Sequence, residues 1–92
     1  MSSPTLAQLT EHRHQATHHL AQFFVVTHLE PYLQWTAQQS ADLARAMIVN
    51  LADGPELTAG LRKLLEAKDC FVRQVVTELA ERDAEGQPGD GG

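Results

Sequence analysis

Two interruptions that contain proline, at Pro31 and at Asp53-Gly54-Pro55-Glu56, divide this chain into three stretches of helical periodicity. Proline has no backbone N–H to donate inside a helix, and it disfavours the helical conformation in the residue before it. We therefore expect an all-α protein with helices over about Thr5–Glu30, Tyr32–Ala52 and Pro55–Ala84.

Each stretch carries apolar side chains on one face, at the spacing of an amphipathic helix. The turn between the second and third helices is short, so these two should pair as an antiparallel helical hairpin, preceded by the N-terminal helix. In the turn, Asp53 can cap the third helix and Glu56 completes a capping box. The apolar faces consist of Leu6, Leu9, Ala16, Leu20, Phe23 and Phe24; of Leu33, Ala37, Ala44, Met47, Ile48 and Leu51; and of Leu57, Leu61, Leu64, Leu65, Val72, Val75, Val76 and Leu79.

The 92 residues are enough for one small domain, which we place at 1–84. Residues 85–92 are rich in glycine and acidic, have nothing to bury, and are expected to form a disordered tail. A domain of this size buries only about 60–65% of the surface of its unfolded chain, so we expect it to form oligomers.

The net charge of −5 comes mainly from the C-terminal segment, and the rest of the chain is close to neutral. This balance excludes binding to a nucleic-acid polymer, which needs a basic surface along many phosphates. No apolar run is long enough to span a membrane. A single cysteine, Cys70, indicates a reducing compartment, and we expect the protein to be cytoplasmic.

Two polar residues interrupt the apolar faces of the predicted hairpin. Lys68 falls within the stripe of the third helix, and Ser40 is central in the stripe of the second. Antiparallel pairing about the turn places them at the same level. An unpaired ammonium is costly to bury, so a bound anion such as a phosphate would relieve the cost. The alternative is that Lys68 extends its ammonium to solvent and Ser40 bonds its own backbone.

Other polar residues allow a structural and a functional interpretation. Arg62 and Arg73 alternate with Glu66 and Asp69 on an adjoining face, as in a solvated salt-bridge ladder or as part of a cationic site. His28 either caps the first helix and packs on aromatic rings, or forms part of an aromatic wall for a base.

The five histidines raise the hypothesis of a metal site, but Glu11, His14 and His18 lie on a face that we expect to be exposed. We therefore predict no metal ligands. No nucleophile has a paired base and no glycine-rich phosphate loop is present, so we expect neither catalysis nor a cofactor.

Two segments carry a resemblance to a known family: HLEPYLQ at 28–34 and DGPELTAGLRKLLEAKDCFVRQVV at 53–76. Together with the helix between them, over about residues 24–79, they resemble the helical-hairpin proteins of phages typified by the anti-CBASS cyclic-oligonucleotide sponge, whose hairpin recurs in an anti-Thoeris sponge. The resemblance implies a hexamer built from dimers, which captures cyclic di- or trinucleotides in the host cytoplasm without cleaving them.

The resemblance also assigns roles to particular residues. Tyr32 or Phe24 would stack on a base with His28 beside it, and Arg73 matches a family arginine. Lys68 stands where the family usually has an uncharged residue. The family's segment of aromatic, histidine and proline is altered here, since Glu30 precedes Pro31.

The sequence thus predicts a binding protein that sequesters cyclic oligonucleotides, with Phe24, His28, Tyr32, Ser40, Arg62, Lys68 and Arg73 as its ligand-binding residues. The alternative is a structural or adaptor oligomer of phage or prophage origin that has no small-molecule ligand. A histidine-dependent metal binder is a third hypothesis.

Overall fold

The computed structural model describes residues 4–26 and 29–85, and the described residues form helices, turns and extended segments without any β-strand. This confirms the prediction of an all-α protein. The helices are α1 (Leu6–Thr10), α2 (Gln15–Ala21), the short 3-10 helix η1 (Gln22–Phe24), α3 (Pro31–Asn50) and α4 (Pro55–Glu85).

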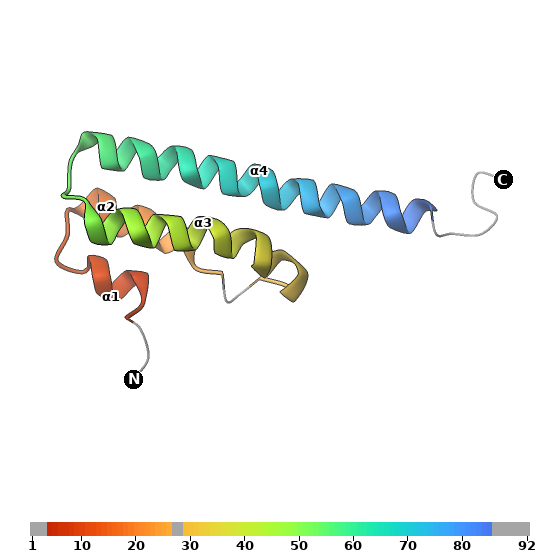
Figure 1. Cartoon of the computed structure of the whole chain (residues 1–92), viewed down its shortest axis with the longest axis horizontal. Helices are drawn as coiled ribbons and strands as arrows, with labels where there is room; N and C mark the ends of the chain where they lie inside the picture. Colours follow the sequence, from red (N-terminus) through yellow and green to blue (C-terminus); the bar gives the residue numbers. More distant parts are fainter. Residues whose placement is uncertain (1–3, 27–28, 86–92) are drawn as a thin grey trace.

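The two long helices, α3 and α4, lie side by side and run in opposite directions, and the distal end of α4 extends past the start of α3 (Figure 1). Pro31 and Pro55 are the first residues of these helices, where the missing N–H of proline costs nothing. The start of α4 is therefore the predicted one, and α3 begins one residue before the predicted Tyr32.

The buried core lies where the N-terminal helices pack against α3 and the first half of α4. Small alanines on α3 let the neighbouring helices approach closely. The largest fully buried apolar side chains are Phe24 of η1, Ile48 of α3 and Leu61 of α4. The buried apolar residues are Leu6, Leu20, Ala21, Phe24, Val26, Ala37, Ala41, Ala44, Ile48, Leu57 and Leu61.

The single N-terminal helix predicted over Thr5–Glu30 is wrong, because α1 ends at Thr10, α2 begins at Gln15, and the chain is extended at Val25. Thr5 caps α1 in a capping box with Gln8. The break follows from tertiary contacts, since the His14 backbone N–H donates to the Asp53 carboxylate at 2.8 Å instead of continuing the helix.

The prediction that Asp53 caps α4 is also not what the structure shows. Its carboxylate accepts hydrogen bonds from the His14 backbone, the Thr17 hydroxyl and the Arg13 guanidinium. Arg13 also donates to the carbonyls of Ile48 and Leu51 at 2.5 and 2.8 Å, which satisfies the C-terminal end of α3. The α3–α4 connection is thereby fastened to the start of α2.

The expected tail, 85–92, lies outside the described residues except for Glu85, the last residue of α4. Within the described ranges, no helix combines the length and apolar character needed to cross a bilayer.

Candidate functional site

The face formed by α3 and α4 carries two adjoining grooves that share Leu43 and Leu64 as lining residues. We call the first the aliphatic groove, of about 420 Å³, lined by Leu43, Met47, Leu51, Glu56, Leu57, Gly60, Leu61 and Leu64. We call the second the aromatic groove, of about 450 Å³, lined by Trp35, Thr36, Gln39, Ser40, Leu43, Leu64, Lys68, Phe71, Gln74 and Val75.

Ser40 and Lys68, the two polar interruptions noted in the sequence, line the same aromatic groove. Ser40 is 7% exposed, within the helix–helix contact. The antiparallel register that places these two residues at one level therefore corresponds to their positions in the structure.

The Lys68 ammonium is not the unpaired cation that the sequence suggested. Its Nζ donates to the Phe23 carbonyl at the end of η1 at 2.7 Å, and it lies 3.7 Å from an Asp69 carboxylate oxygen. It also lies 6.0 Å from the centre of the Phe24 ring, a distance at which a cation is attracted to an aromatic face. The side chain is only 13% exposed. Since these contacts stabilise the charge, the burial of the Lys68 side chain does not require a bound anion.

Trp35 and Phe71 are the functional candidates that the sequence reasoning missed. Both line the aromatic groove, and their exposed fractions of 72% and 61% are the highest among the large apolar residues on this face. Trp35 begins a stripe at four-residue spacing on α3 that continues through Gln39, Leu43 and Met47, all of which line the two grooves. That spacing was the signal available in the sequence.

The aromatic residues predicted to stack on a base lie elsewhere. Phe24 is 1% exposed and belongs to the core, so its ring offers no face to a ligand in this structure. Tyr32 is exposed near the start of α3 but does not line the aromatic groove. His28 lies outside the described residues.

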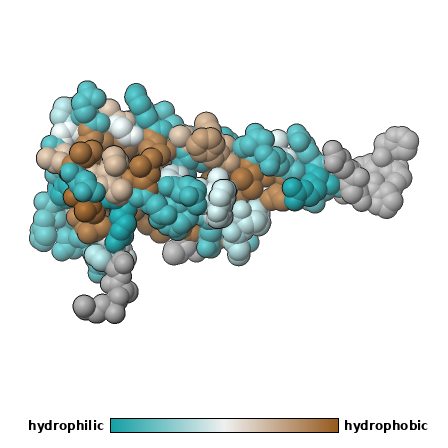
Figure 2. Space-filling model, in the orientation of Figure 1, coloured by the Kyte–Doolittle hydropathy of each residue, from teal (hydrophilic) through white to brown (hydrophobic). Residues whose placement is uncertain are grey.

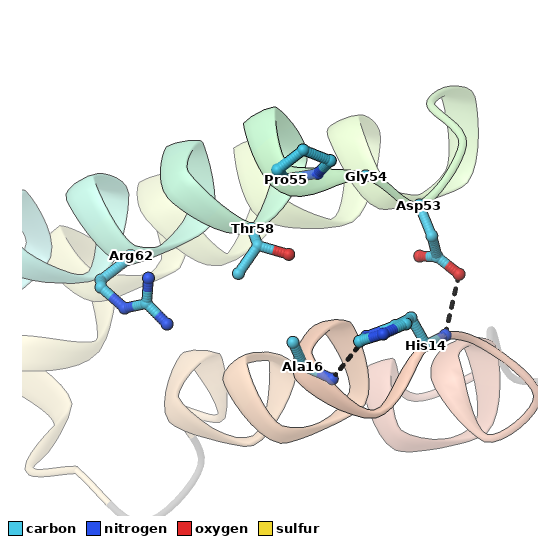
Figure 3. A pocket seen from close by; sticks show the side chains of 7 residues that line it. All are labelled: His14, Ala16, Asp53, Gly54, Pro55, Thr58 and Arg62. Carbon is cyan, nitrogen blue, oxygen red and sulfur yellow. Dashed lines mark hydrogen bonds between the residues drawn. The ribbon is translucent and has the colours of Figure 1, made fainter.

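The two predicted arginines are also separated from Ser40 and Lys68. Arg73 is exposed and donates to the Cys70 sulfur on its own helix at 3.3 Å. Arg62 lines a different pocket, of about 530 Å³, between the start of α2 and the start of α4 (Figure 3). Of the predicted site residues that the structure describes, Ser40 and Lys68 therefore line one groove, and Phe24 lies beside the Lys68 ammonium but in the core.

The pocket at Arg62 also contains His14 and Asp53 (Figure 3). The backbone N–H of His14 is the main reason why the pKa of Asp53 is held below its ordinary value, and the Thr17 hydroxyl and the Arg13 guanidinium add to the effect. The His14 imidazole Nδ1 accepts from the Ala16 N–H at 3.1 Å and caps α2. The charged and polar groups at this end therefore hold the helices together.

The described residues contain no cluster of three or more His, Cys, Asp or Glu side chains arranged to bind a metal ion. His18 Nδ1 instead lies 2.9 Å from the Thr10 hydroxyl, which itself donates to the Leu6 carbonyl. Cys70 is exposed. The aromatic groove, by contrast, presents the exposed rings of Trp35 and Phe71, an arrangement that is suited to binding flat rings.

Comparisons with models of protein families, with curated proteins and with solved structures find no match to this chain.

Proposed function

We propose that this protein is a non-catalytic binding protein that captures cyclic di- or trinucleotides, as its resemblance to the phage sponges suggests. The observation that supports it is the aromatic groove, in which exposed Trp35 and Phe71 stand beside Ser40 and Lys68. Flat aromatic faces and polar donors in one groove match the two parts of a cyclic nucleotide, its bases and its phosphates.

The stacking role moves from Phe24 and Tyr32 to Trp35 and Phe71 in this proposal. Base–aromatic stacking contributes about 1–3 kcal/mol per base. An ammonium has three N–H donors and the Phe23 carbonyl takes one, so Lys68 can also donate to a phosphate. Gln39 and Gln74 add amide groups to the groove walls.

Self-association is part of the proposal, because one groove on one chain is open to solvent along its length. Repeated copies would surround a ring from several sides, and a hexamer is the assembly that the resemblance implies. We propose a cytoplasmic site of action.

The test is a titration of the full chain with a panel of cyclic di- and trinucleotides, followed by calorimetry and by the fluorescence of Trp35, the only tryptophan. Stacking should quench Trp35 emission in step with the heat of binding. The corresponding linear dinucleotides are the ligand control. The absence of heat and quenching with every ring at about 100 µM would reject the proposal.

Two variants test whether the ligand binds in the aromatic groove. Phe71→Ala should weaken binding at least roughly tenfold, the loss of about one stacking contact. Val49→Ala is the matched control, because Val49 is also exposed, at 58%, but lines neither groove. Equal affinity of the two variants would show that the ligand binds elsewhere.

The second candidate is a structural or adaptor oligomer without a small-molecule ligand. The aliphatic groove favours it, because a surface lined by Leu43, Met47 and Leu51 resembles a contact between proteins more than a nucleotide site. Native mass spectra that show an oligomer with no bound ring from the same panel would support this candidate over the first.

A further inference from the structure

Lys68 belongs to two parts of the molecule at once. Its side chain lines the aromatic groove together with Leu64 and Phe71, which lie about one turn before and after it on α4. Its ammonium, however, contacts the Phe23 carbonyl and the Phe24 ring, and neither of these residues lines the groove. The N-terminal helices therefore fix the position of the cation that the proposed ligand needs.

The hydrogen bond from Lys68 to Phe23 also holds the N-terminal helices in place. Among the residues in 4–26 and 29–85, it is the only hydrogen bond between α4 and the helices that precede α3, since the others from this part reach α3 or the turn before α4. The chain becomes extended at Val25, so the last carbonyls of η1 lack donors within the helix. Lys68 supplies a donor to one of them.

The N-terminal helices are attached at two ends. At the start of α2, the Asp53 carboxylate accepts from the His14 backbone, beside the turn that leads into α4. Figure 2 shows apolar side chains gathered over this end of the molecule, where Leu57 and Leu61 of α4 belong to the core. At the end of η1, the hydrogen bond to α4 comes from Lys68. Loss of the Lys68 contact would therefore free η1 while α2 stays attached beside the turn.

We propose that the contact between Lys68 and Phe23 is autoinhibitory: the N-terminal helices hold the ammonium out of the aromatic groove, and a ligand phosphate that draws it in releases η1. This regulation rests on the proposed function, because it concerns the same groove and the same ligand. The ammonium has donors for both partners, but the partners compete for the position of Nζ at the end of its flexible stem. A hydrogen bond to an ionised phosphate is stronger than one to a neutral carbonyl, so the phosphate can displace the carbonyl.

The coupling between ligand and η1 is reciprocal. A ligand that needs Lys68 to leave Phe23 loses part of its binding free energy to breaking that contact. Ligand affinity should therefore rise when the contact is weakened, and η1 should loosen when the ligand binds. If the contact only supported the groove, weakening it would lower the affinity instead.

Hydrogen exchange of the full chain without ligand tests the contact itself. In Lys68→Met, the amides of residues 22–26 should exchange about fivefold faster than in the parent, because η1 has lost one hydrogen bond. Arg73→Met is the matched control: it also removes a cation from α4, but that cation bonds to Cys70 on its own helix, and exchange should equal that of the parent. Unchanged exchange at residues 22–26 in Lys68→Met would overturn the proposal, whatever the protein binds.

Phe24→Leu tests the sign of the coupling. Leucine fills most of the buried space but removes the ring that attracts the ammonium. We expect the affinity for cyclic dinucleotides, measured by calorimetry, to rise about two- to fivefold. Ile48→Val is the control, because it trims another fully buried side chain that is not among the contacts of the Lys68 ammonium, and its affinity should equal that of the parent. A lower affinity in Phe24→Leu, with helical content kept, would contradict autoinhibition.

Exchange of the parent chain with a saturating cyclic dinucleotide completes the test without any substitution. The amides of residues 22–26 should exchange faster when the ring is bound, by about the same factor as in Lys68→Met. Unchanged or slower exchange, with heat of binding present, would overturn the autoinhibition and leave the proposed function standing. If no ring of the panel binds, both fail, and faster exchange in Lys68→Met then shows only a structural contact.

Discussion

Arg13 and Asp53, forty positions apart in the sequence, form an ion pair in which a guanidinium nitrogen and a carboxylate oxygen are 2.9 Å apart. Through this pair the break between α1 and α2 is joined to the connection between α3 and α4. The side chains are 22% and 29% exposed, and each makes further hydrogen bonds to backbone groups at helix ends. The pair therefore fixes how the N-terminal helices meet the two long ones.

Asp53→Asn should lower the melting temperature by several degrees while helical content at low temperature stays high. Asparagine keeps one acceptor but loses the charge that pairs with Arg13 and a carboxylate oxygen that accepts from His14 or Thr17. Circular dichroism melts provide the measurement. Asp42→Asn is the control, because Asp42 accepts only from Gln38 on its own helix. Equal melting temperatures for the two variants would show that Asp53 is not structural.

The pH dependence of stability should show that the charge of the Asp53 carboxylate stabilises the fold. Because its pKa is lowered in the folded protein, its contribution to stability is fully present above the ordinary value of 3.8 and is lost as the pH falls through the folded pKa. The difference in unfolding free energy between the parent and Asp53→Asn should thus be constant between about pH 7 and pH 5 and shrink below about pH 4. Urea unfolding at a series of pH values tests this, and a constant difference down to about pH 2 would contradict it.

Ile48→Ala should reduce the free energy of unfolding by about 2–5 kcal/mol, because it leaves a cavity where a fully buried side chain packs on α3. Val49→Ala, one position along, should change it by less than about 0.5 kcal/mol, since Val49 is 58% exposed. Chemical denaturation at one protein concentration compares them. A similar loss for both would mean that the face of α3 that packs inward is different from the one described.

Lys68→Met should destabilise the fold by about 1–2 kcal/mol because the Phe23 carbonyl loses its donor. Arg73→Met should have little effect, because the exposed Arg73 guanidinium donates to the Cys70 sulfur on its own helix and, among the described residues, bonds to no other helix. The same unfolding assay without ligand measures both. If Lys68→Met were as stable as the parent, the lysine would be free to serve a ligand alone.

The long helices were predictable because their signals are local. Prolines at their first positions and apolar residues at regular spacing set both starts, and the predicted ends at Ala52 and Ala84 are within two residues of the observed Asn50 and Glu85. The N-terminal helix was not predictable in this way. Its periodicity continues from Leu6 to Phe24, but the break at residues 11–14 depends on a carboxylate from a distant turn.

In the candidate site, too, the features set by local signals were predictable and those set by tertiary contacts were not. Counting residues back from the turn predicted that Ser40 and Lys68 share a level, since antiparallel helices have a fixed register. Whether Lys68 is paired, and whether Phe24 is accessible, depends on where η1 lies against α4, and no periodicity contains that information.

The sequence by itself determined the helical class, the two long helices and the side of each that is apolar, because these depend on backbone sterics and on residues a few positions apart. Only the tertiary structure decided which apolar residues are core and which remain on the surface. The stripes of α3 and α4 are wider than the contact between the two helices and the short N-terminal segments can cover. The face that carries the two grooves therefore keeps exposed apolar side chains, among them Leu43, Met47, Trp35 and Phe71, and the aromatic groove on this face is where we propose that a ligand binds.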